Sequence, residues 1–325
     1  MGARKTMGST AEVRRNGAPR RARRGSALGL VICGLGGILA FVGQPSTATS
    51  PGLNGSFVVD SGRQPGLIMG RPDGTEARQL TSGPAFDGCP AVSPSGQLVG
   101  FCRANETGYD LWLVNVDGSN ARQLTQFPAN TASLNPTFSS SRPRVAFSFV
   151  RDWSAVGAVP GLTFDIHSIR SDGTEPRRLT RSVEWHDFSP TFSPDGHSLL
   201  WTRTGATRQN DGRTQLWIMR ANGKDKRQVP ADINRNQGAD WSPDGRLIVY
   251  RSGDALKIIR PDGTLVRLIA NGGKDPVWSP NGQWIAYRTV THIELVSRDG
   301  STTRSVPRFW GQGHLRNFAW QPLPQ

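Results

Sequence analysis

Apolar runs of about five to eight residues recur along the chain from residue 52 onward, and short polar turns separate them. Two kinds of segment alternate. In one, an apolar strand meets an Asp-Gly-type turn and a strand ending in Arg-x-Leu-Thr or a relative. It covers 67–81, 111–125, 166–180, 216–230, 256–270 and 293–307. In the other, a short strand, a Ser-Pro-Asp-Gly-type turn and an apolar strand cover 89–103, 135–149, 189–203, 238–252 and 275–289, with a truncated copy at 317–325. Such short runs predict half-buried and fully buried strands.

The turn residues predict how these strands connect. Asp-Gly and Asn-Gly supply the positive φ angles of tight hairpins, and proline presets φ at the first turn position. Two successive half-repeats therefore predict a four-stranded antiparallel meander. One meander cannot bury both of its faces, so several must pack radially. The sequence predicts an all-β, six-bladed β-propeller over residues 55–325.

The two ends of the repeat region complement each other. Residues 55–60 match the second strand of a unit that lacks a first, and residues 317–321 match a first strand that lacks a second. We expect the C-terminal strand to complete the N-terminal blade, which closes the ring and removes its open edges.

Two sets of repeated residues have structural interpretations. One large side chain per inner strand predicts a buried ring, because such residues each bury roughly 150–250 Å²: Val92, Phe138, Phe192, Trp241, Trp278 and Trp320. One arginine per outer strand is expected to brace the neighbouring blade: Arg78, Arg122, Arg178, Arg227, Arg267 and Arg304.

The first 48 residues have the order of a secretory leader. A basic stretch ends at Arg23-Arg24, an uncharged apolar run covers 27–43, and small residues lead to Ala48 as the cleavage point. The protein is predicted to be exported to the periplasm or the cell exterior, with residues 49–54 as a short linker. The alternative is an uncleaved N-terminal anchor, since the apolar run reaches the short limit for crossing a bilayer.

The net charge of +14 divides between leader and repeats. The leader holds eight basic residues and one acidic residue, which is half of that charge. The remainder is mildly basic, and its arginines recur once per repeat instead of forming a stripe beside exposed aromatic residues. This argues against a nucleic-acid partner.

Cys89 and Cys102 flank the turn at residues 93–96. If Ser93 lies opposite Leu98, Cys89 falls opposite Cys102, and in an oxidising compartment the pair can form a cross-strand disulfide. The alternative is two buried free thiols. No metal site is expected here, because no third ligand lies nearby at a suitable spacing.

Three long segments interrupt the repeat at 151–164, 204–214 and 308–316, and all are expected on the face opposite the short turns. They or their neighbours carry the residue types that anchor protein interfaces: Trp153, Trp185, Trp310, Arg151, Arg308 and Arg316. These are the predicted partner-binding residues. The alternative is that the tryptophans fold back over the blades as local caps.

The residues just before the inner strands are predicted to form a polar channel mouth. They are Asp87, Asn135, His186, Asp187, Asn236, Lys274, Asp275, Arg316 and Asn317. Such a funnel can hold a ligand, an ion or a peptide end, or it can be solvated lining without a ligand.

The repeat resembles that of the TolB-like propellers, which are written around Trp-Ser-Pro-Asp-Gly on inner strands and Asp-Gly-Thr with Arg-Leu-Thr on outer ones. The best matches are Trp241–Gly245, Phe192–Gly196 and Trp278–Gly282, and the resemblance covers about residues 52–325. TolB itself carries an α/β domain before its propeller, whereas this propeller is expected directly after the leader. The motif consists of turn and core residues, so it indicates the fold and not the function.

The resemblance implies a non-catalytic scaffold of the bacterial cell envelope. We expect a monomeric propeller without cofactor that engages a protein or peptide through its long-loop face. Its membrane contact would be limited to an uncleaved leader. No Gly-x-Ser-x-Gly motif of a hydrolase is present. The alternative is a metal-dependent, lyase-like carbohydrate enzyme in which His186, His314 and either Asp87 or Asp187 hold the metal.

Overall fold

The computed structural model describes residues 52–60, 65–156, 159, 161–207, 213–231, 238–311 and 315–323. The predicted leader at 1–48 therefore lies outside the described residues. Of the predicted linker, residues 52–54 are described, and Leu53 and Asn54 already belong to the first strand. Nowhere in the described part of the chain does a helix reach the length and apolar character that a membrane crossing requires.

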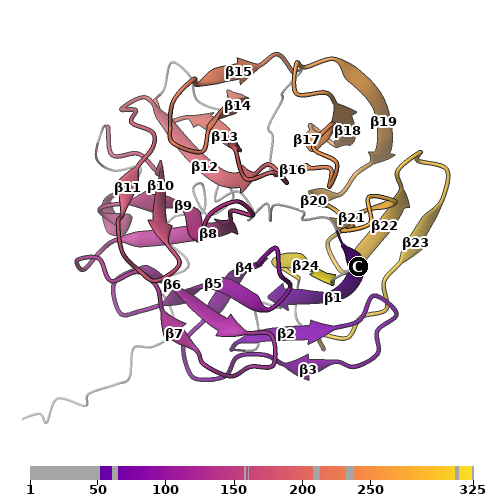
Figure 1. Ribbon diagram of the computed structural model, residues 1–325, viewed down its shortest axis with the longest axis horizontal. Helices are drawn as coiled ribbons and strands as arrows, with labels where there is room; N and C mark the ends of the chain where they lie inside the picture. Colours follow the sequence, from indigo (N-terminus) through magenta and orange to yellow (C-terminus); the bar gives the residue numbers. More distant parts are fainter. Residues whose placement is uncertain are drawn as a thin grey trace, which may run out of the picture. The chain divides into compact units, whose positions relative to one another are not determined.

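The described residues form twenty-four strands, in antiparallel sheets that follow one another round a ring (Figure 1). The sheet containing both chain ends orders β24 (Asn317–Leu323), β1 (Leu53–Asp60), β2 (Leu67–Gly70) and β3 (Arg78–Gln79). Pairs such as Val58 with Ala319 join β24 to β1. The C-terminal strand thus completes the N-terminal sheet, as the ends of the repeat region predicted.

The next part of the ring is an eight-stranded sheet with two meanders. The first contains β4 (Asp87–Val92), β5 (Leu98–Ala104), β6 (Tyr109–Asn115) and β7 (Arg122–Gln123). The second contains β8 (Ala132–Phe138), β9 (Arg144–Val150), β10 (Asp165–Arg170) and β11 (Arg177–Arg178). A single parallel pairing of Tyr109 with Ala132 joins them.

Three further four-stranded sheets complete the ring. The first contains β12 (Trp185–Phe192), β13 (Ser198–Gly205), β14 (Thr214–Arg220) and β15 (Arg227–Val229). The second contains β16 (Ala239–Trp241), β17 (Ile248–Ser252), β18 (Ala255–Ile259) and β19 (Leu265–Asn271). The third contains β20 (Lys274–Trp278), β21 (Trp284–Arg288), β22 (Ile293–Ser297) and β23 (Thr303–Ser305). The all-β propeller fold is confirmed. A count of six blades depends on dividing the eight-stranded sheet at its parallel pairing.

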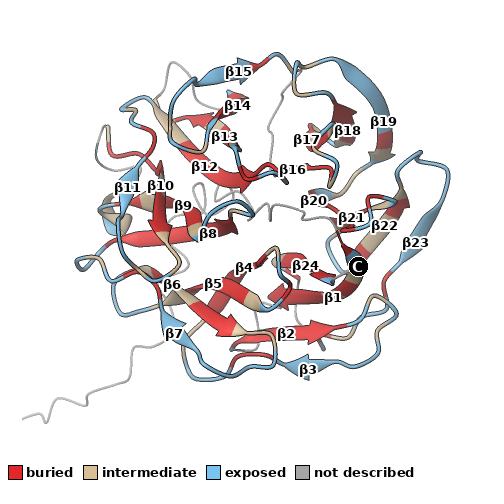
Figure 2. Ribbon diagram, in the orientation of Figure 1, coloured by how far each residue is buried: buried red, intermediate tan, exposed pale blue. Residues whose placement is uncertain are grey.

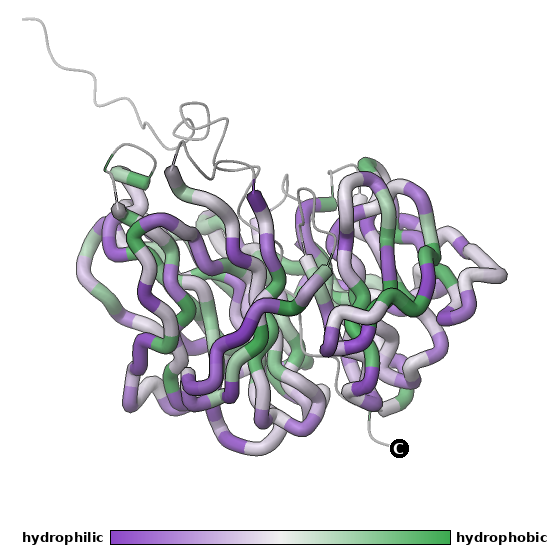
Figure 3. Tube along the Cα trace, turned by 90° about the horizontal axis from the view of Figure 1, so that it is seen from above, coloured by the Kyte–Doolittle hydropathy of each residue, from purple (hydrophilic) through white to green (hydrophobic). Residues whose placement is uncertain are grey.

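Burial decreases from the inner strands to the outer ones (Figure 2). The ring of large side chains is buried as predicted, with Trp278 fully inaccessible and Trp241 and Trp320 each 4% exposed. Figure 3 shows hydrophobic and hydrophilic stretches alternating along the chain. Apolar burial of this kind provides the main stabilisation of the fold.

Four inner strands share a bulge that the repeat pattern did not predict. Cys89, Asn135, Ser189 and Asp275 each adopt positive φ, between 43° and 56°, and each precedes a proline. The pairing with the next strand shifts at each of these points. Since proline cannot donate to the ladder, a bulge lets the strand continue past it.

This bulge changes the expected cysteine register. Gly88, not Cys89, lies opposite Cys102, so the predicted pairing was wrong by one residue. Ser93 donates its N–H to Leu98 as expected, and the extra residue is absorbed between Gly88 and Ala91. The structure nevertheless places a disulfide between Cys89 and Cys102, whose Cα atoms lie 5.7 Å apart.

The outer-strand arginines brace neighbouring meanders at four junctions. Arg122 donates to the carbonyl of Ser171 at 2.6 Å and Arg227 to that of Pro261 at 3.0 Å. Arg78 and Arg267 bind Val116 and Asp299 in the same way. Each acceptor lies in the Asp-Gly-type turn of the following meander, which ties successive units together.

The remaining two arginines do not brace. Arg178 was assigned to the wrong register, because strand pairing shows that Arg177 is the counterpart of Arg122. Arg177 binds Glu175 of its own turn at 2.7 Å. Arg304 stacks over Trp284 of its own sheet, with 4.7 Å between the guanidinium carbon and the ring centroid.

Candidate functional site

The acidic residues at the channel mouth are buried and bound by arginines. Asp87 accepts hydrogen bonds from Arg103 Nε and Nη2 at 2.6 and 2.7 Å, and Asp187 accepts from Arg203 at 2.7 and 3.0 Å. Each arginine lies directly opposite its aspartate on the second strand. These two-pronged pairs use both oxygens of each carboxylate.

Asp275 is also bound by an arginine of the next strand, but only one of its two carboxylate oxygens accepts a hydrogen bond from it. Arg288 donates to its Oδ2 at 2.9 Å, whereas Oδ1 has no hydrogen-bond partner among the described residues. Burial raises the pKa of the Asp275 carboxyl, and Arg288 opposes that shift. The three aspartates of the predicted polar channel mouth are therefore held in ion pairs within their own sheets.

The other predicted mouth residues differ in exposure. Asn135 is buried and donates to Ser189 Oγ at 3.0 Å, which links β8 to β12. Asn317 donates to Asp60 at 3.1 Å, and Lys274 is exposed. Asn236 lies outside the described residues.

His186 packs among aromatic rings. The N–H of Phe164 donates to its Nδ1 at 3.2 Å, so the neutral ring carries its proton on Nε2. The ring lies beside Phe164 and Phe188. Burial lowers the pKa of His186 to about 4, and the ring is neutral near pH 7. In the described part of the chain, no three histidine, cysteine or acidic side chains gather as a metal site would require, and His314 lies outside it.

The predicted tryptophan contacts divide into surface and core. Trp310 is 1% exposed and packs in an apolar cluster with Phe318 and Trp320, so its assignment as a partner contact was wrong. Trp153 and Trp185 are half-buried. Trp153 makes edge contacts with the rings of Tyr109 and Phe164.

The predicted arginine contacts all remain on the surface. Arg151, Arg308 and Arg316 are exposed. Arg308 donates to the Thr291 carbonyl at 2.6 Å, and Arg316 lies over the Phe86 ring at 5.2 Å. These contacts hold the side chains of Arg308 and Arg316 in place, and both side chains remain accessible to solvent.

Exposed valines on the long-loop face were missed by the sequence analysis. Val159, Val183 and Val290 are 50%, 66% and 74% exposed, and each lies in a connection on that face. Thr163 donates to the Ser182 carbonyl at 2.6 Å, which joins the loop of Val159 to the segment of Val183. The loops that carry these valines have no shared motif, so the one sequence signal for them is that they lie outside the repeat.

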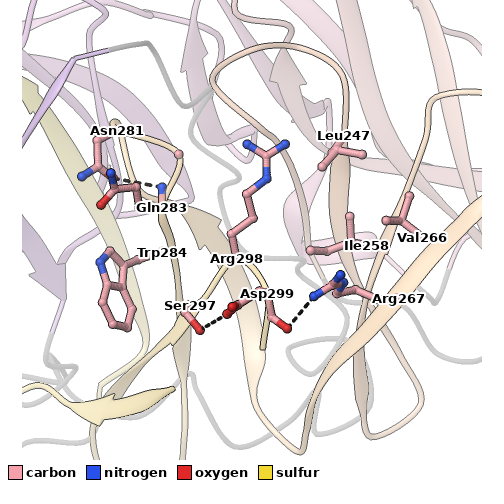
Figure 4. Close-up of a pocket in the computed structure, with 11 residues that line it drawn as sticks. Leu247, Ile258, Val266, Arg267, Asn281, Gln283, Trp284, Ser297, Arg298 and Asp299 are labelled. Atoms are coloured by element: carbon pink, nitrogen blue, oxygen red, sulfur yellow. Dashed lines mark hydrogen bonds between the residues drawn. The ribbon is translucent and has the colours of Figure 1, made fainter. Parts of the chain in front are cut away.

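A cavity of about 660 Å³ lies between the β16–β19 and β20–β23 sheets (Figure 4). Arg298 extends between Gln283 and Leu247, and Arg267 turns to Asp299. Both guanidinium groups are engaged, since Arg267 binds the Asp299 carbonyl at 2.5 Å and Arg298 binds Asp244 at 3.3 Å. The adjoining β19 is an outer strand of seven residues whose Leu265 and Leu268 are more than half exposed.

Comparisons with known proteins agree with this geometry. The family profile described as TolB beta propeller domain matches residues 72–324. Tol-Pal system protein TolB of Zymomonas mobilis is 29% identical over 83 residues, which cover 26% of this chain and 17% of that sequence. The structure of TolB from Acinetobacter baumannii aligns with a TM-score of 0.66 at 19% identity, over 82% of this chain and 66% of that chain.

An enzyme shares the same architecture. An oligogalacturonate lyase in complex with manganese aligns with a TM-score of 0.53 at 13% identity, over 80% of this chain and 86% of that one. At such identities the structural likeness shows the fold alone. The aligned segment also spans only a small part of the Zymomonas sequence, so the likeness does not extend to that whole protein.

Proposed function

Because the chain belongs to the TolB beta propeller domain family, we propose that it is a non-catalytic, protein-binding component of the bacterial cell envelope. It engages a protein or peptide partner through its long-loop face. The basic and apolar leader supports export to the periplasm or the cell exterior. In this proposal the propeller acts as a monomer, and only an uncleaved leader would contact the membrane.

The exposed valines of the long-loop face carry the proposal. Val159, Val183 and Val290 are at least half exposed, and the exposed Arg151 belongs to the same loop as Val159. Apolar side chains at the centre and arginines nearby are the usual composition of a protein interface. The half-buried Trp153 and Trp185 add aromatic surface to this face.

The chemistry of the channel mouth also supports binding over catalysis. A general acid or base needs an accessible carboxyl group within reach of a substrate. Asp87 and Asp187 are at most 1% exposed, and arginines occupy both oxygens of each. Their geometry supports the role of holding the inner and second strands together.

Site-specific cross-linking in the native envelope tests this function. A photo-reactive residue at position 183 should capture a defined envelope protein, and the same residue at Lys224, in a turn on the opposite face, should not. Val183→Asp should weaken binding of the purified captured protein about tenfold or more, since the substitution places an unpaired carboxylate in the apolar part of the interface. Equal capture from both faces, or unchanged binding by the variant, would contradict the proposal.

A further inference from the structure

A second cavity, of about 390 Å³, lies between the β8–β11 meander and the β12–β15 sheet. Its floor is apolar and includes Leu179 and Phe192. Four arginines line its wall: Arg142, Arg144, Arg177 and Arg220. They come from both sides of the junction, so the cavity is a cationic groove between two units.

Two of these arginines replace the residues that the repeat normally carries. Arg144 begins the second strand of its meander, where the equivalent positions hold uncharged residues: Leu98, Ser198, Leu247 and Trp284. Arg142 stands where the other turns of this type have a glycine, such as Gly196. Packing and turn geometry do not require an arginine at either place, because the same fold is built elsewhere in the chain without one.

The third arginine is released from the bracing role of its counterparts. Arg122 and Arg227 each reach the turn of the following unit, whereas Arg177 stays with Glu175 of its own turn. The junction is therefore open at its outer side. This leaves the Arg177 guanidinium on the wall of the groove.

The groove has more positive than negative charge. Glu175 binds both Arg144 and Arg177, at 3.3 and 2.7 Å, and Asp225 binds Arg220 at 2.7 Å. Four guanidinium groups thus share two carboxylates, which leaves an excess of two positive charges. Burial and the neighbouring Arg177 both lower the pKa of Arg144, as expected where positive charge is concentrated.

We propose that this groove binds a phosphate group, carried by a small molecule or by a lipid headgroup. Guanidinium groups donate paired hydrogen bonds that fit phosphate oxygens. A phosphate monoester carries close to two negative charges at pH 7, which matches the excess of the groove, whereas one carboxylate carries a single charge. The volume lies within the range of small-molecule sites, about 300–1,000 Å³. This site is separate from the long-loop face and does not depend on the proposed protein partner.

Calorimetric titration of the full chain with inorganic pyrophosphate tests the soluble source. Arg144→Leu introduces the residue found at two of the four equivalent positions, Leu98 and Leu247, and Arg220→Gln changes an exposed side chain, so both variants should fold. Each should weaken binding about tenfold or more, because a hydrogen bond between charged groups is lost. Arg260→Gln is the matched control, since Arg260 occupies the place of Arg220 one sheet further on, and it should bind as the wild type does.

Vesicle sedimentation tests the lipid source with the same variants. Wild-type protein should bind vesicles containing phosphatidic acid more than vesicles of phosphatidylcholine alone, and Arg144→Leu and Arg220→Gln should lose that preference. Groove-dependent binding in either experiment supports the proposal and identifies the source. The proposal is overturned if neither probe binds, if the variants bind as the wild type does, or if an acidic peptide binds the groove and pyrophosphate does not.

Discussion

At the scale of single residues, the channel mouth shows how burial changes the role of a polar side chain. Asp187 and His186 are adjacent in sequence, yet Asp187 is bound by Arg203 and His186 packs against Phe188. The sequence placed both near the mouth but could not show which would be open to a ligand. Arg203 comes from the neighbouring strand β13, and the sequence alone does not show which residue of that strand lies opposite Asp187.

Lowering the pH from 6.5 to 4 should destabilise the protein through His186. Its folded-state pKa is about 4 and its unfolded value is near 6.5, so in this window the unfolded state binds the proton and the folded state does not. Stability is therefore lost as the pH falls. His186→Gln should reduce this loss by up to about 3 kcal/mol, measured by urea unfolding across the pH range.

Asp165 provides a comparison of opposite sign. Burial raises the pKa of its carboxyl to about 6, so the folded state holds the extra proton and gains relative stability as the pH falls through 6 toward 4. Asp165→Asn should make the acid-induced loss larger. If His186→Gln and Asp165→Asn changed the pH profile in the same direction, this assignment of the pKa shifts would be wrong.

At the scale of strands and turns, the repeat predicted most of the architecture. The turns and apolar runs are local signals, and they placed the strands and the closure by β24 correctly. The bulges before Pro90, Pro136, Pro190 and Pro276 were not predicted, because they require knowledge of which residue lies opposite. The error in the cysteine register has this origin, whereas the error at Arg178 came from choosing between two adjacent arginines, Arg177 and Arg178.

The disulfide between β4 and β5 should stabilise the first meander. Closing so short a loop contributes about 3 kcal/mol, mainly by restricting the unfolded chain. Reducing the wild-type protein should lower its free energy of unfolding by about that amount. The double variant Cys89→Ala with Cys102→Ala should be equally destabilised and insensitive to reductant. A wild-type stability that does not respond to reductant would show that the two thiols are not bonded in solution.

At the scale of the whole propeller, the two ends of the repeat region form one sheet. Asn54 pairs with Pro322, and β24 contributes the buried Phe318 and Trp320 to the core. The contacts that close the ring join residues more than 200 positions apart, such as the bond from Trp320 Nε1 to the Gly55 carbonyl. Closure at this sheet is therefore the most non-local step in forming the fold.

A chain ending at Arg316 should fail to form a cooperative propeller. It lacks β24, so β1 becomes an open edge and the surroundings of Phe57 lose two large aromatic neighbours. Loss of the near-ultraviolet circular dichroism and of the sharp unfolding transition is the expected result. A chain ending at Leu323 retains all of β24 and is the control. Cooperative unfolding of the shorter chain would contradict the importance of this closure.

The arginine braces also differ from one junction of the ring to the next. Between the β8–β11 meander and the β12–β15 sheet, the bond from Asn135 to Ser189 holds the channel side. At the outer side, Arg177 binds Glu175 of its own turn instead of bracing the next sheet. A junction that is bonded at its inner edge and lacks an arginine brace at its outer edge is expected to separate at the outer edge first. An anion bound between the arginines of both units would then supply the contact that the arginine braces provide at other junctions.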